Sequence, residues 1–372
     1  MKIGIFSSIL GRTGGPAVYD QKLIEVLSRI DTENDYVVYG ATKQALTGLA
    51  LANRRFTGRT VIPSGKWLSI AIGLSAELVR HPIDFLHATF VAPPLVPCKL
   101  ISTMTCWSQY DSPTFYPPLI RWRLQYLLNN AMRKSTAIIC YTDYLKQKVI
   151  EKFEIPDERV FVVPAGVGDE MKPLADKHPV EEFLKRVGID GPYILFIGQI
   201  TERKNVEGLV RAYEILKRSR NIDHKLVIVG ETGFLSDRIF RTVADLKLGS
   251  DVVFPGRFSY RELPLFYNGA DVFVFPTFSE GFGLPPLEAM ACRCPVVASN
   301  VTSVPEVVGD AALLVDPHSP DEIADSIYRA IFNPEVRTNL IRRGEQRARR
   351  FTWSETGART AECYQRVHAA GW

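Results

Sequence analysis

The stretch Phe278-Ser-Glu-Gly-Phe-Gly-Leu-Pro-Pro-Leu-Glu-Ala-Met-Ala-Cys292 follows closely on an apolar run, Asp271–Pro276. The apolar run predicts a buried strand, and the two consecutive prolines predict the first turn of a helix, where proline is tolerated. Two carboxylates, Glu280 and Glu288, have seven residues between them. The stretch therefore predicts a strand, a loop and a helix, with Glu280 in the loop and Glu288 near the helix start.

Gly281 and Gly283 follow the first carboxylate within this loop. Glycine lets the backbone approach a ligand closely, and the first N–H groups of a helix have no partner inside the helix, so such a junction can bind an anion. The alternative is an ordinary turn between a strand and a helix, in which the glycines only permit tight geometry.

The composition is that of an ordinary globular protein. The 372 residues are 46% hydrophobic and 23% charged, and this length suits two domains better than one core. A formal net charge of +4 is too small for this length to indicate a nucleic-acid partner. No apolar run approaches the roughly 20 residues that a membrane-spanning helix needs.

The start of the chain and its cysteines bear on location. The apolar residues Ile3–Leu10 follow directly on Met1 and Lys2, which predicts a first strand and no signal peptide. The six cysteines form no Cys-x-x-Cys pair and have no matching histidine cluster. We therefore expect a reducing, cytoplasmic compartment and no metal site.

Short apolar runs alternate with amphipathic segments along the whole chain. This alternation predicts parallel sheets covered by helices, and two such series joined near 168–190 predict two doubly wound α/β domains that face a central cleft. Ligands of such sheets bind beyond the carboxyl ends of the strands, where the Glu280 loop is expected to open. The predicted strands are Lys2–Ser8, Tyr36–Gly40, Arg59–Ile62, Ile83–His87, Lys99–Thr105, Thr136–Tyr141, Val160–Pro164, Tyr193–Gly198, Lys225–Gly230, Asp251–Pro255, Asp271–Pro276, Pro295–Ser299 and Ala312–Val315.

Several of these strands end in residues suited to a nucleoside diphosphate. Arg203 and Lys204 stand at a helix start beyond a glycine turn, where they suit a diphosphate; alternatively they are solvated loop charges. Gly256 and Arg257 end a later strand, and Val304 lies at a further helix start. Several helix starts that converge on one cleft predict a site for a nucleoside diphosphate.

The carboxylates add recognition of hydroxyl groups. Glu288 is predicted to bind the ribose hydroxyls, and Glu280 the hydroxyls of the attached group. In the first half, Gly14 and Gly15 either let a substrate phosphate or sugar approach or only form a tight turn. His87 ends a strand, where it either contacts the donor sugar or acceptor or has a structural role.

A helical stripe in the first half is predicted to be buried, and it consists of Ile120, Leu124, Leu127, Leu128 and Ala131. Four cations lie mostly off this stripe: Arg121, Arg123, Arg133 and Lys134. A charged outer face is usually only solvated. The alternative is contact with anionic lipid or with a lipid-linked acceptor.

Four capping boxes predict helix starts, because the hydroxyl and the carboxylate of each box can satisfy unpaired N–H groups. They are Ser259–Glu262, Ser303–Glu306, Ser319–Glu322 and Thr352–Glu355.

The second half resembles the retaining glycosyltransferases of the GT-B fold in glycosyltransferase family 4, which includes many mannosyl- and glucosyltransferases. The resemblance is strong from about 190 to 355 and weaker in the first half, at Gly14-Gly15, Asp84–His87 and Phe161–Gly166. The residues that carry it are Phe196–Asn205, Phe254–Arg257, Ala270–Pro276, Ser279–Cys292 and Val304–Pro317.

This resemblance implies two Rossmann-like domains. Residues 1–170 are expected to bind the acceptor and 191–352 the nucleotide sugar, with a linker at 171–190. A final helix, 353–372, is expected to cross back to the first domain.

The resemblance also implies transfer of a hexose with retention, without a metal or cofactor, in polysaccharide or glycoconjugate assembly. Glu280, Lys204 and His87 are the expected catalytic residues, with Lys204 neutralising the departing phosphate. The expected donor-binding residues are Glu288, Arg203, Gly281, Phe282, Gly283, Leu284, Gly256, Arg257, Gly14, Gly15 and Val304. The donor is GDP-mannose or a UDP-hexose, and the acceptor is a saccharide or a lipid-linked molecule. Peripheral association with the inner face of a membrane is left open.

The chain departs from the family pattern at three places. Gln199 stands where the family often has arginine, Thr103–Trp107 lacks a histidine, and Arg293-Cys294 replaces a glycine and a small residue. The first two departures leave open a non-catalytic sugar-nucleotide-binding subunit. A GT-B nucleotide-sugar epimerase is a further alternative, which the spacing of the two glutamates disfavours.

Overall fold

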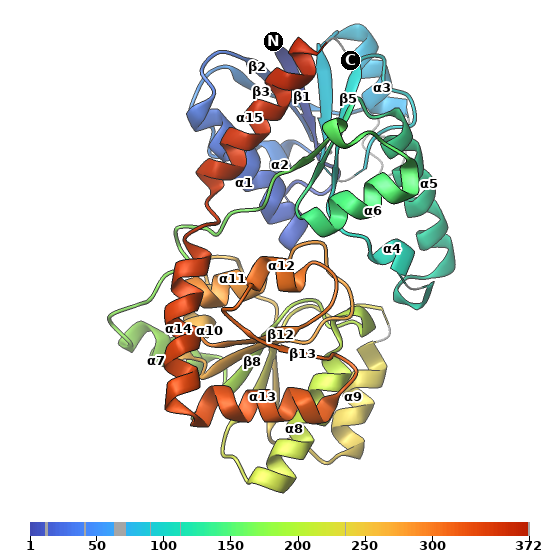
Figure 1. Ribbon diagram of the computed structural model, residues 1–372. Helices are drawn as coiled ribbons and strands as arrows, with labels where there is room; N and C mark the ends of the chain where they lie inside the picture. Colours follow the sequence, from blue (N-terminus) through green and yellow to red (C-terminus); the bar gives the residue numbers. More distant parts are fainter. Residues whose placement is uncertain are drawn as a thin grey trace. The chain divides into compact units, whose positions relative to one another are not determined.

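The computed structural model describes residues 1–11, 14–40, 42–62, 72–89, 91–111, 113–234 and 236–370. The chain forms two compact units (Figure 1). Unit 1 comprises Met1–Pro113, Pro118–Gly166 and Thr352–Trp372, and unit 2 comprises Thr114–Pro117 and Val167–Phe351.

A seven-stranded parallel sheet forms the centre of unit 1, with the strand order β3-β2-β1-β4-β5-β6-β7. Helix α15 packs against α1, where Gly357 lies against Val26 and Ile30 (Figure 1). The elements of unit 1 are β1 (Lys2–Phe6), α1 (Gly15–Ile30), β2 (Asp35–Gly40), α2 (Lys43–Thr47), β3 (Phe56–Thr60), α3 (Leu74–Arg80), β4 (Phe85–Ala88), β5 (Lys99–Met104), α4 (Ser108–Asp111), η2 (Pro113–Phe115, which extends past the unit boundary), α5 (Pro118–Lys134), β6 (Ala137–Cys140), α6 (Asp143–Phe153), η3 (Asp157–Arg159), β7 (Val160–Val162) and α15 (Trp353–Ala369).

A six-stranded parallel sheet forms the centre of unit 2, with the strand order β10-β9-β8-β11-β12-β13. Helices α8 and α13 pack together. The elements are α7 (His178–Arg186), β8 (Tyr193–Ile197), η4 (Glu202–Lys204), α8 (Val206–Arg220), β9 (Lys225–Val229), α9 (Ser236–Asp245), β10 (Val252–Gly256), α10 (Leu263–Gly269), β11 (Val272–Phe275), α11 (Leu284–Ala291), β12 (Val296–Ser299), α12 (Val304–Val308), β13 (Leu313–Val315), α13 (Pro320–Phe332) and α14 (Pro334–Ala348).

The predicted α/β fold class is confirmed, and every predicted strand is present. The largest displacement is at β3, which was expected at Arg59–Ile62 and lies at Phe56–Thr60. This strand is at the edge of its sheet and is mostly exposed, so apolar residues do not mark its ends. No helix in the described part of the chain combines the length and apolar character needed to cross a bilayer.

Glycine is required where β8 and β9 end. A Cβ atom added to Gly230 would lie 1.8 Å from the carbonyl oxygen of Gly198, which is shorter than any van der Waals contact. The backbone that leaves β8 therefore passes directly over Gly230. This close approach sets the path of the loop that leads to Lys204.

Two of the predicted boxes start helices as expected, with the bond to the hydroxyl oxygen formed. Ser319 Oγ accepts a hydrogen bond from the backbone N–H of Glu322 at the start of α13, at 3.2 Å. Thr352 Oγ1 accepts from the N–H of Glu355 at the start of α15, also at 3.2 Å.

The other two predicted boxes do not start a helix at their serines, although the Ser259–Glu262 contact itself is present. Helix α10 begins only after Glu262, so Ser259 lies in the preceding turn, where its N–H and hydroxyl bind the Glu262 carboxylate. Ser303 makes no capping bond at α12, since its hydroxyl donates to the backbone carbonyl of Glu280 at 2.9 Å.

The predicted buried stripe of α5 is wrong at its N-terminal end. Leu127, Leu128 and Ala131 are buried as expected, but Ile120 is 50% exposed. Only the C-terminal half of this helix therefore packs fully on the unit.

His87 joins three elements of unit 1. It lies on β4 and is fully buried; its Nδ1 is 2.7 Å from the Tyr364 hydroxyl of α15, and its Nε2 is 2.7 Å from Thr103 Oγ1 of β5. Burial lowers the pKa of His87 to about 3, so the ring is neutral near pH 7, with one nitrogen donating and the other accepting. These bonds hold the last helix against the sheet.

The Tyr364→Phe variant should lower the stability of unit 1 by about 1–2 kcal/mol, because a buried imidazole nitrogen then loses its partner. Urea unfolding of the full chain, followed by circular dichroism, should show a lower midpoint. Tyr126→Phe, at a 56% exposed tyrosine of the same unit, is the matched control and should leave the midpoint unchanged. Equal midpoints for both variants would contradict this role of the His87–Tyr364 contact.

Candidate functional site

The candidate site is built from loops that follow adjacent strands of unit 2. Arg203 and Lys204 lie in η4 after β8, Glu280 lies in the loop after β11, and Thr302 and Ser303 follow β12. Strands β8, β11 and β12 are neighbours in the sheet and run parallel. Their carboxyl ends therefore bring the three loops to one edge, as expected for a ligand site in a parallel sheet.

A carboxylate held by two cations is the centre of this site. Arg203 Nη1 lies 2.7 Å from Glu280 Oε1, and Lys204 Nζ donates to the same oxygen. The three side chains are only 18%, 11% and 12% exposed, respectively, for arginine, lysine and glutamate. The cluster has two positive charges and one negative charge, so it keeps a net charge of +1 in a largely buried position.

The electrostatics keep Glu280 ionised. Burial alone would raise the pKa of this carboxyl, but the charges and hydrogen bonds of Arg203 and Lys204 outweigh burial and lower it. The Lys204 ammonium also lies 4.7 Å from the centre of the Phe275 ring, which further favours a cation there. The ammonium is thus placed between a carboxylate and an aromatic face.

Backbone contacts join the cationic loop to the Glu280 loop. The Phe278 N–H donates to the Arg203 carbonyl at 2.9 Å, and Thr277 Oγ1 donates to the same carbonyl at 3.1 Å. In return, Arg203 Nη1 donates to the Ser279 carbonyl at 2.7 Å. The two loops are therefore fixed to each other at several points around the ion cluster.

The loop after β12 supports Glu280 from a third direction. Thr302 Oγ1 accepts a hydrogen bond from the Glu280 N–H at 3.2 Å, while Ser303 donates to the Glu280 carbonyl. Thr302 has a φ of 55°, in the left-handed region that is strongly disfavoured for a β-branched residue. Such strain persists only where the surroundings impose it, and it is typical of functional sites.

The helix start predicted from the sequence is present. Gly283 precedes α11 with a φ of 96°, which favours glycine, and Leu284 is the first helical residue. Phe282 is buried and Val304 is fully buried, with a methyl group of Val304 4.0 Å from the position of a Cβ on Gly283. The segment from Gly281 to Leu284 thus directly follows Glu280 and opens the helix.

Glu288 lies in a different environment, inside α11. It is 3% exposed, and its Oε2 accepts a hydrogen bond from the Tyr267 hydroxyl at 3.0 Å. Burial raises the pKa of Glu288 to about 7, opposed by hydrogen bonds from Tyr260 and Tyr267 and assisted by the charge of Glu170. The carboxyl is therefore partly protonated near neutral pH.

The remaining predicted residues belong to other elements than the ion cluster. Gly256 ends β10 with a φ of 91°, and Arg257 Nη1 lies 3.2 Å from Glu231 Oε2 in an exposed pair. Gly14 and Gly15 belong to unit 1, at the start of α1. His87 also belongs to unit 1, where its ring is enclosed and both nitrogens have partners, a geometry that supports a structural role.

The sequence did not point to several side chains that the structure brings to the two glutamates. Thr277, Thr302 and Ser303 contact the Glu280 loop, and Tyr260 and Tyr267 interact with Glu288. Thr277 directly follows a predicted strand, and Thr302 and Ser303 come a few residues after another, which was a weak signal for the first group. The tyrosines carried no signal, because no local pattern pairs them with a glutamate on the next helix.

The structure explains the arginine that departs from the family pattern. Arg293 has a φ of 62° just after α11, in the left-handed conformation that usually falls to glycine at a helix end. Its Nε and Nη2 lie 3.2 and 3.1 Å from the carboxylate oxygens of Glu345 on α14. The ion pair links the end of α11 to α14.

Two family models match the chain. The model described as Glycosyl transferases group 1 matches residues 180–347, and the model described as Glycosyltransferase Family 4 matches residues 21–170. Together they span most of both units.

Similar proteins agree with these matches. The O-antigen chain mannosyltransferase B of Escherichia coli is 31% identical over 72% of this chain and 70% of its own length. A serotype-specific mannosyltransferase, also from Escherichia coli, is 29% identical over 63% of the chain, which spans only 29% of that relative. Among solved structures, Anabaena HepE in complex with UDP and glucose has a TM-score of 0.76 at 18% identity, covering 98% of this chain and 99% of that one. At this low identity, the similarity to HepE is evidence for the fold alone.

The buried Glu288 should make the stability of the protein fall as the pH rises, and Glu288→Gln should remove this dependence. Its native pKa is raised from 4.5 to about 7, so its contribution is fully present below pH 4.5 and is lost as the pH rises through 7. The melting temperature of the wild type should therefore fall relative to the variant across this range, by the equivalent of about 3 kcal/mol. Asp20, whose pKa burial also raises to about 7, is common to both proteins and cancels in the comparison. A difference in melting temperature between the wild type and the variant that stays constant from pH 4 to 8 would contradict the raised pKa of Glu288.

Proposed function

Because the chain belongs to the group 1 and family 4 glycosyltransferases, we propose that it is a retaining, metal-independent hexosyltransferase. It moves mannose from GDP-mannose to a saccharide or lipid-linked acceptor in the assembly of a polysaccharide or glycoconjugate. The single observation that carries the proposal is the Arg203–Glu280–Lys204 cluster at the carboxyl edge of the unit 2 sheet.

The net positive charge of this cluster suits a diphosphate leaving group. When the bond between the sugar and the diphosphate breaks, negative charge develops on the β-phosphate oxygens. Lys204 and Arg203 are held in place before the reaction by Glu280, so they stabilise this charge without having to reorganise. The N–H groups that open α11 add to this stabilisation. We assign to these groups the work that a bound metal ion does in other transferases.

Glu280 is suited to hold the sugar and poorly suited to attack it. An ionised carboxylate accepts hydrogen bonds from sugar hydroxyls, and the two cations keep it ionised. The same cations withdraw charge from the oxygen that a nucleophile would use. We therefore propose that Glu280 positions the donor sugar and that the acceptor attacks on the face from which the diphosphate leaves.

Glu288 is proposed to bind the ribose. Its raised pKa lets the carboxyl either accept from a ribose hydroxyl or, when protonated, donate to one. The Tyr267 hydroxyl fixes its orientation. The preference for mannose and GDP rests on the similarity to mannosyltransferases. The HepE structure, which contains UDP and glucose, makes a UDP-hexose the competing donor.

Thermal shift with nucleotides should identify the donor, since at equal concentration a ligand that binds the native state more tightly stabilises it more. GDP and GDP-mannose should raise the melting temperature more than UDP and UDP-glucose at equal concentration. A larger shift with the uridine pair would replace GDP-mannose by a UDP-hexose. No shift with any nucleotide or nucleotide sugar would contradict a nucleotide-sugar site.

Slow hydrolysis of GDP-mannose to GDP should reveal the catalytic groups in the absence of an acceptor. Lys204→Ala should lower this rate by about 10²–10³-fold, because it removes preorganised charge from the leaving group. Lys185→Ala, at an exposed lysine of unit 2, is the control and should not change it. EDTA should have no effect, and the released sugar should keep its anomeric configuration when followed by NMR.

A wild type that binds GDP-mannose without turning it over, with or without mannosyl acceptors, would instead favour a non-catalytic binding subunit. Loss of activity in EDTA that Mg²⁺ or Mn²⁺ restores would contradict the role given to the two cations.

A further inference from the structure

We propose that the exposed N-terminal half of α5 is a docking surface for a membrane that contains anionic lipid. The proposal goes beyond the transfer reaction and does not depend on the identity of the donor. It rests on the side chains of the α5 face, defined here as Leu119, Trp122 and Tyr126.

The α5 face is apolar, although it is open to solvent. Leu119, Trp122 and Tyr126 are 66%, 64% and 56% exposed, and their spacing of three and four residues places them on one side of the helix. Ile120, at 50% exposure, borders them. Large apolar side chains that gather on one helical face, instead of standing singly, mark an interaction site.

The opposite side of α5 accounts for how the helix is held. The side chains buried against unit 1 are Leu127, Leu128, Ala131 and Met132. These four residues, all in the C-terminal half of α5, are therefore the ones that pack the helix on unit 1. The α5 face is additional to what the fold requires of this helix.

The aromatic residues of the α5 face suit a bilayer interface. The rings of Trp122 and Tyr126 are stacked, with centroids 6.1 Å apart and planes 18° apart. Tryptophan and tyrosine combine an apolar ring with a polar N–H or O–H group, and for this reason they are enriched where membrane meets water. A stacked pair is a preformed anchor that loses little conformational freedom on insertion.

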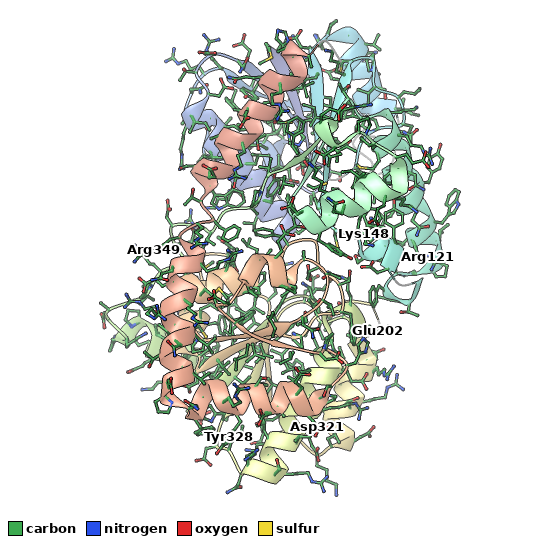
Figure 2. All side chains as sticks on the ribbon, in the orientation of Figure 1. Arg121, Lys148, Glu202, Asp321, Tyr328 and Arg349 are labelled. Atoms are coloured by element: carbon green, nitrogen blue, oxygen red, sulfur yellow. The ribbon has the colours of Figure 1, made fainter. Side chains whose placement is uncertain are left out.

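The charge of α5 indicates which lipids it meets. The helix contains four cations and no acidic residue, the cations being Arg121, Arg123, Arg133 and Lys134. The last two are favoured by the helix dipole at the C-terminal end, but Arg121 closes the first turn, where the dipole disfavours a cation. Figure 2 labels Arg121 on this helix. Cations beside exposed aromatic residues, in a place that helix stability does not favour, complement the negative surface of anionic lipids.

The geometry fits a helix that lies in the plane of the membrane surface. The α5 face would enter the boundary between headgroups and acyl chains, while the flanking arginines remain at the level of the phosphates. Attachment through an interfacial helix and its cations is reversible and sensitive to salt.

Co-sedimentation of the full chain with vesicles tests the proposal. Wild-type protein should bind vesicles of phosphatidylglycerol and phosphatidylcholine, and should bind pure phosphatidylcholine vesicles at least about tenfold more weakly. Trp122→Ala/Tyr126→Ala should weaken binding to the anionic vesicles by about tenfold or more, because the apolar anchor is lost. Arg121→Gln/Arg123→Gln should weaken it by roughly fivefold for each cation. Circular dichroism should show that both variants fold.

A matched control uses two arginines of unit 2. Arg342→Gln/Arg343→Gln removes the same charge from exposed positions of α14 and should bind as the wild type does. Equal weakening in both arginine pairs would mean that only the net charge matters and would overturn the α5 face as the docking surface. Failure of the wild type to bind anionic vesicles would overturn the proposal outright, as would stronger binding to dextran sulfate than to those vesicles.

Fluorescence locates the contact within the protein. Lipids with brominated acyl chains should quench the tryptophan emission of the bound wild type, and most of this quenching should vanish in Trp122→Phe, which keeps an apolar ring and should still sediment with vesicles. Unchanged quenching in Trp122→Phe would contradict insertion of this residue. Hydrolysis of GDP-mannose in vesicle-free buffer should be equal in all α5 variants, so that failure of docking is distinguished from failure of the proposed activity.

Discussion

The contact of Glu280 with Arg203 and Lys204 is the constraint around which unit 2 is arranged. Three charged side chains with little exposure are tolerated only when they are paired and hydrogen-bonded. Here both cations come from the loop after β8, and the carboxylate comes from the loop after β11. Removing Glu280 would leave two adjacent buried cations, whereas removing one cation leaves a neutral pair. The cluster therefore holds the loops after β8 and β11 in one arrangement, and it keeps a net positive charge.

The backbone around this cluster carries strain that the cluster helps to explain. Thr302 and Asn205 both have left-handed φ angles, 55° and 53°, in loops that flank Glu280. Asn205 is fixed by its Nδ2, which donates to the Pro317 carbonyl at 2.6 Å, and Thr302 by the N–H of Glu280. A β-branched residue such as Thr302 costs on the order of 1–3 kcal/mol in this conformation, whereas asparagine adopts it more readily. The close approach of Gly198 and Gly230 fixes the start of the loop that carries Arg203, Lys204 and Asn205.

The sequence was sufficient for the parts of the molecule that local patterns encode. Apolar runs predicted the strands, and the spacing of Glu280 and Glu288 around two glycines and two prolines predicted the loop and α11. The sequence was not sufficient where the partner or the burial of a side chain depends on residues far away in the chain. Ser303 was expected to cap α12 but binds the Glu280 carbonyl, and Ile120 fitted a buried stripe but is exposed. The partners of His87 lie on β5 and α15, and only the folded chain brings Thr103 and Tyr364 to it.

The two glutamates of the motif differ through their surroundings, although they are the same residue type on one strand–loop–helix segment. Two cations lower the pKa of Glu280 against the effect of burial, whereas tyrosine hydroxyls cannot offset burial at Glu288, and its pKa rises to about 7. Environments that push two carboxyl groups apart divide their roles. Glu280 stays an acceptor of hydrogen bonds beside positive charge, while Glu288 can accept or donate. Because both residues are glutamate, this division of roles comes from the cations beside Glu280 and from the burial and tyrosines around Glu288, so changing those neighbours would change the roles.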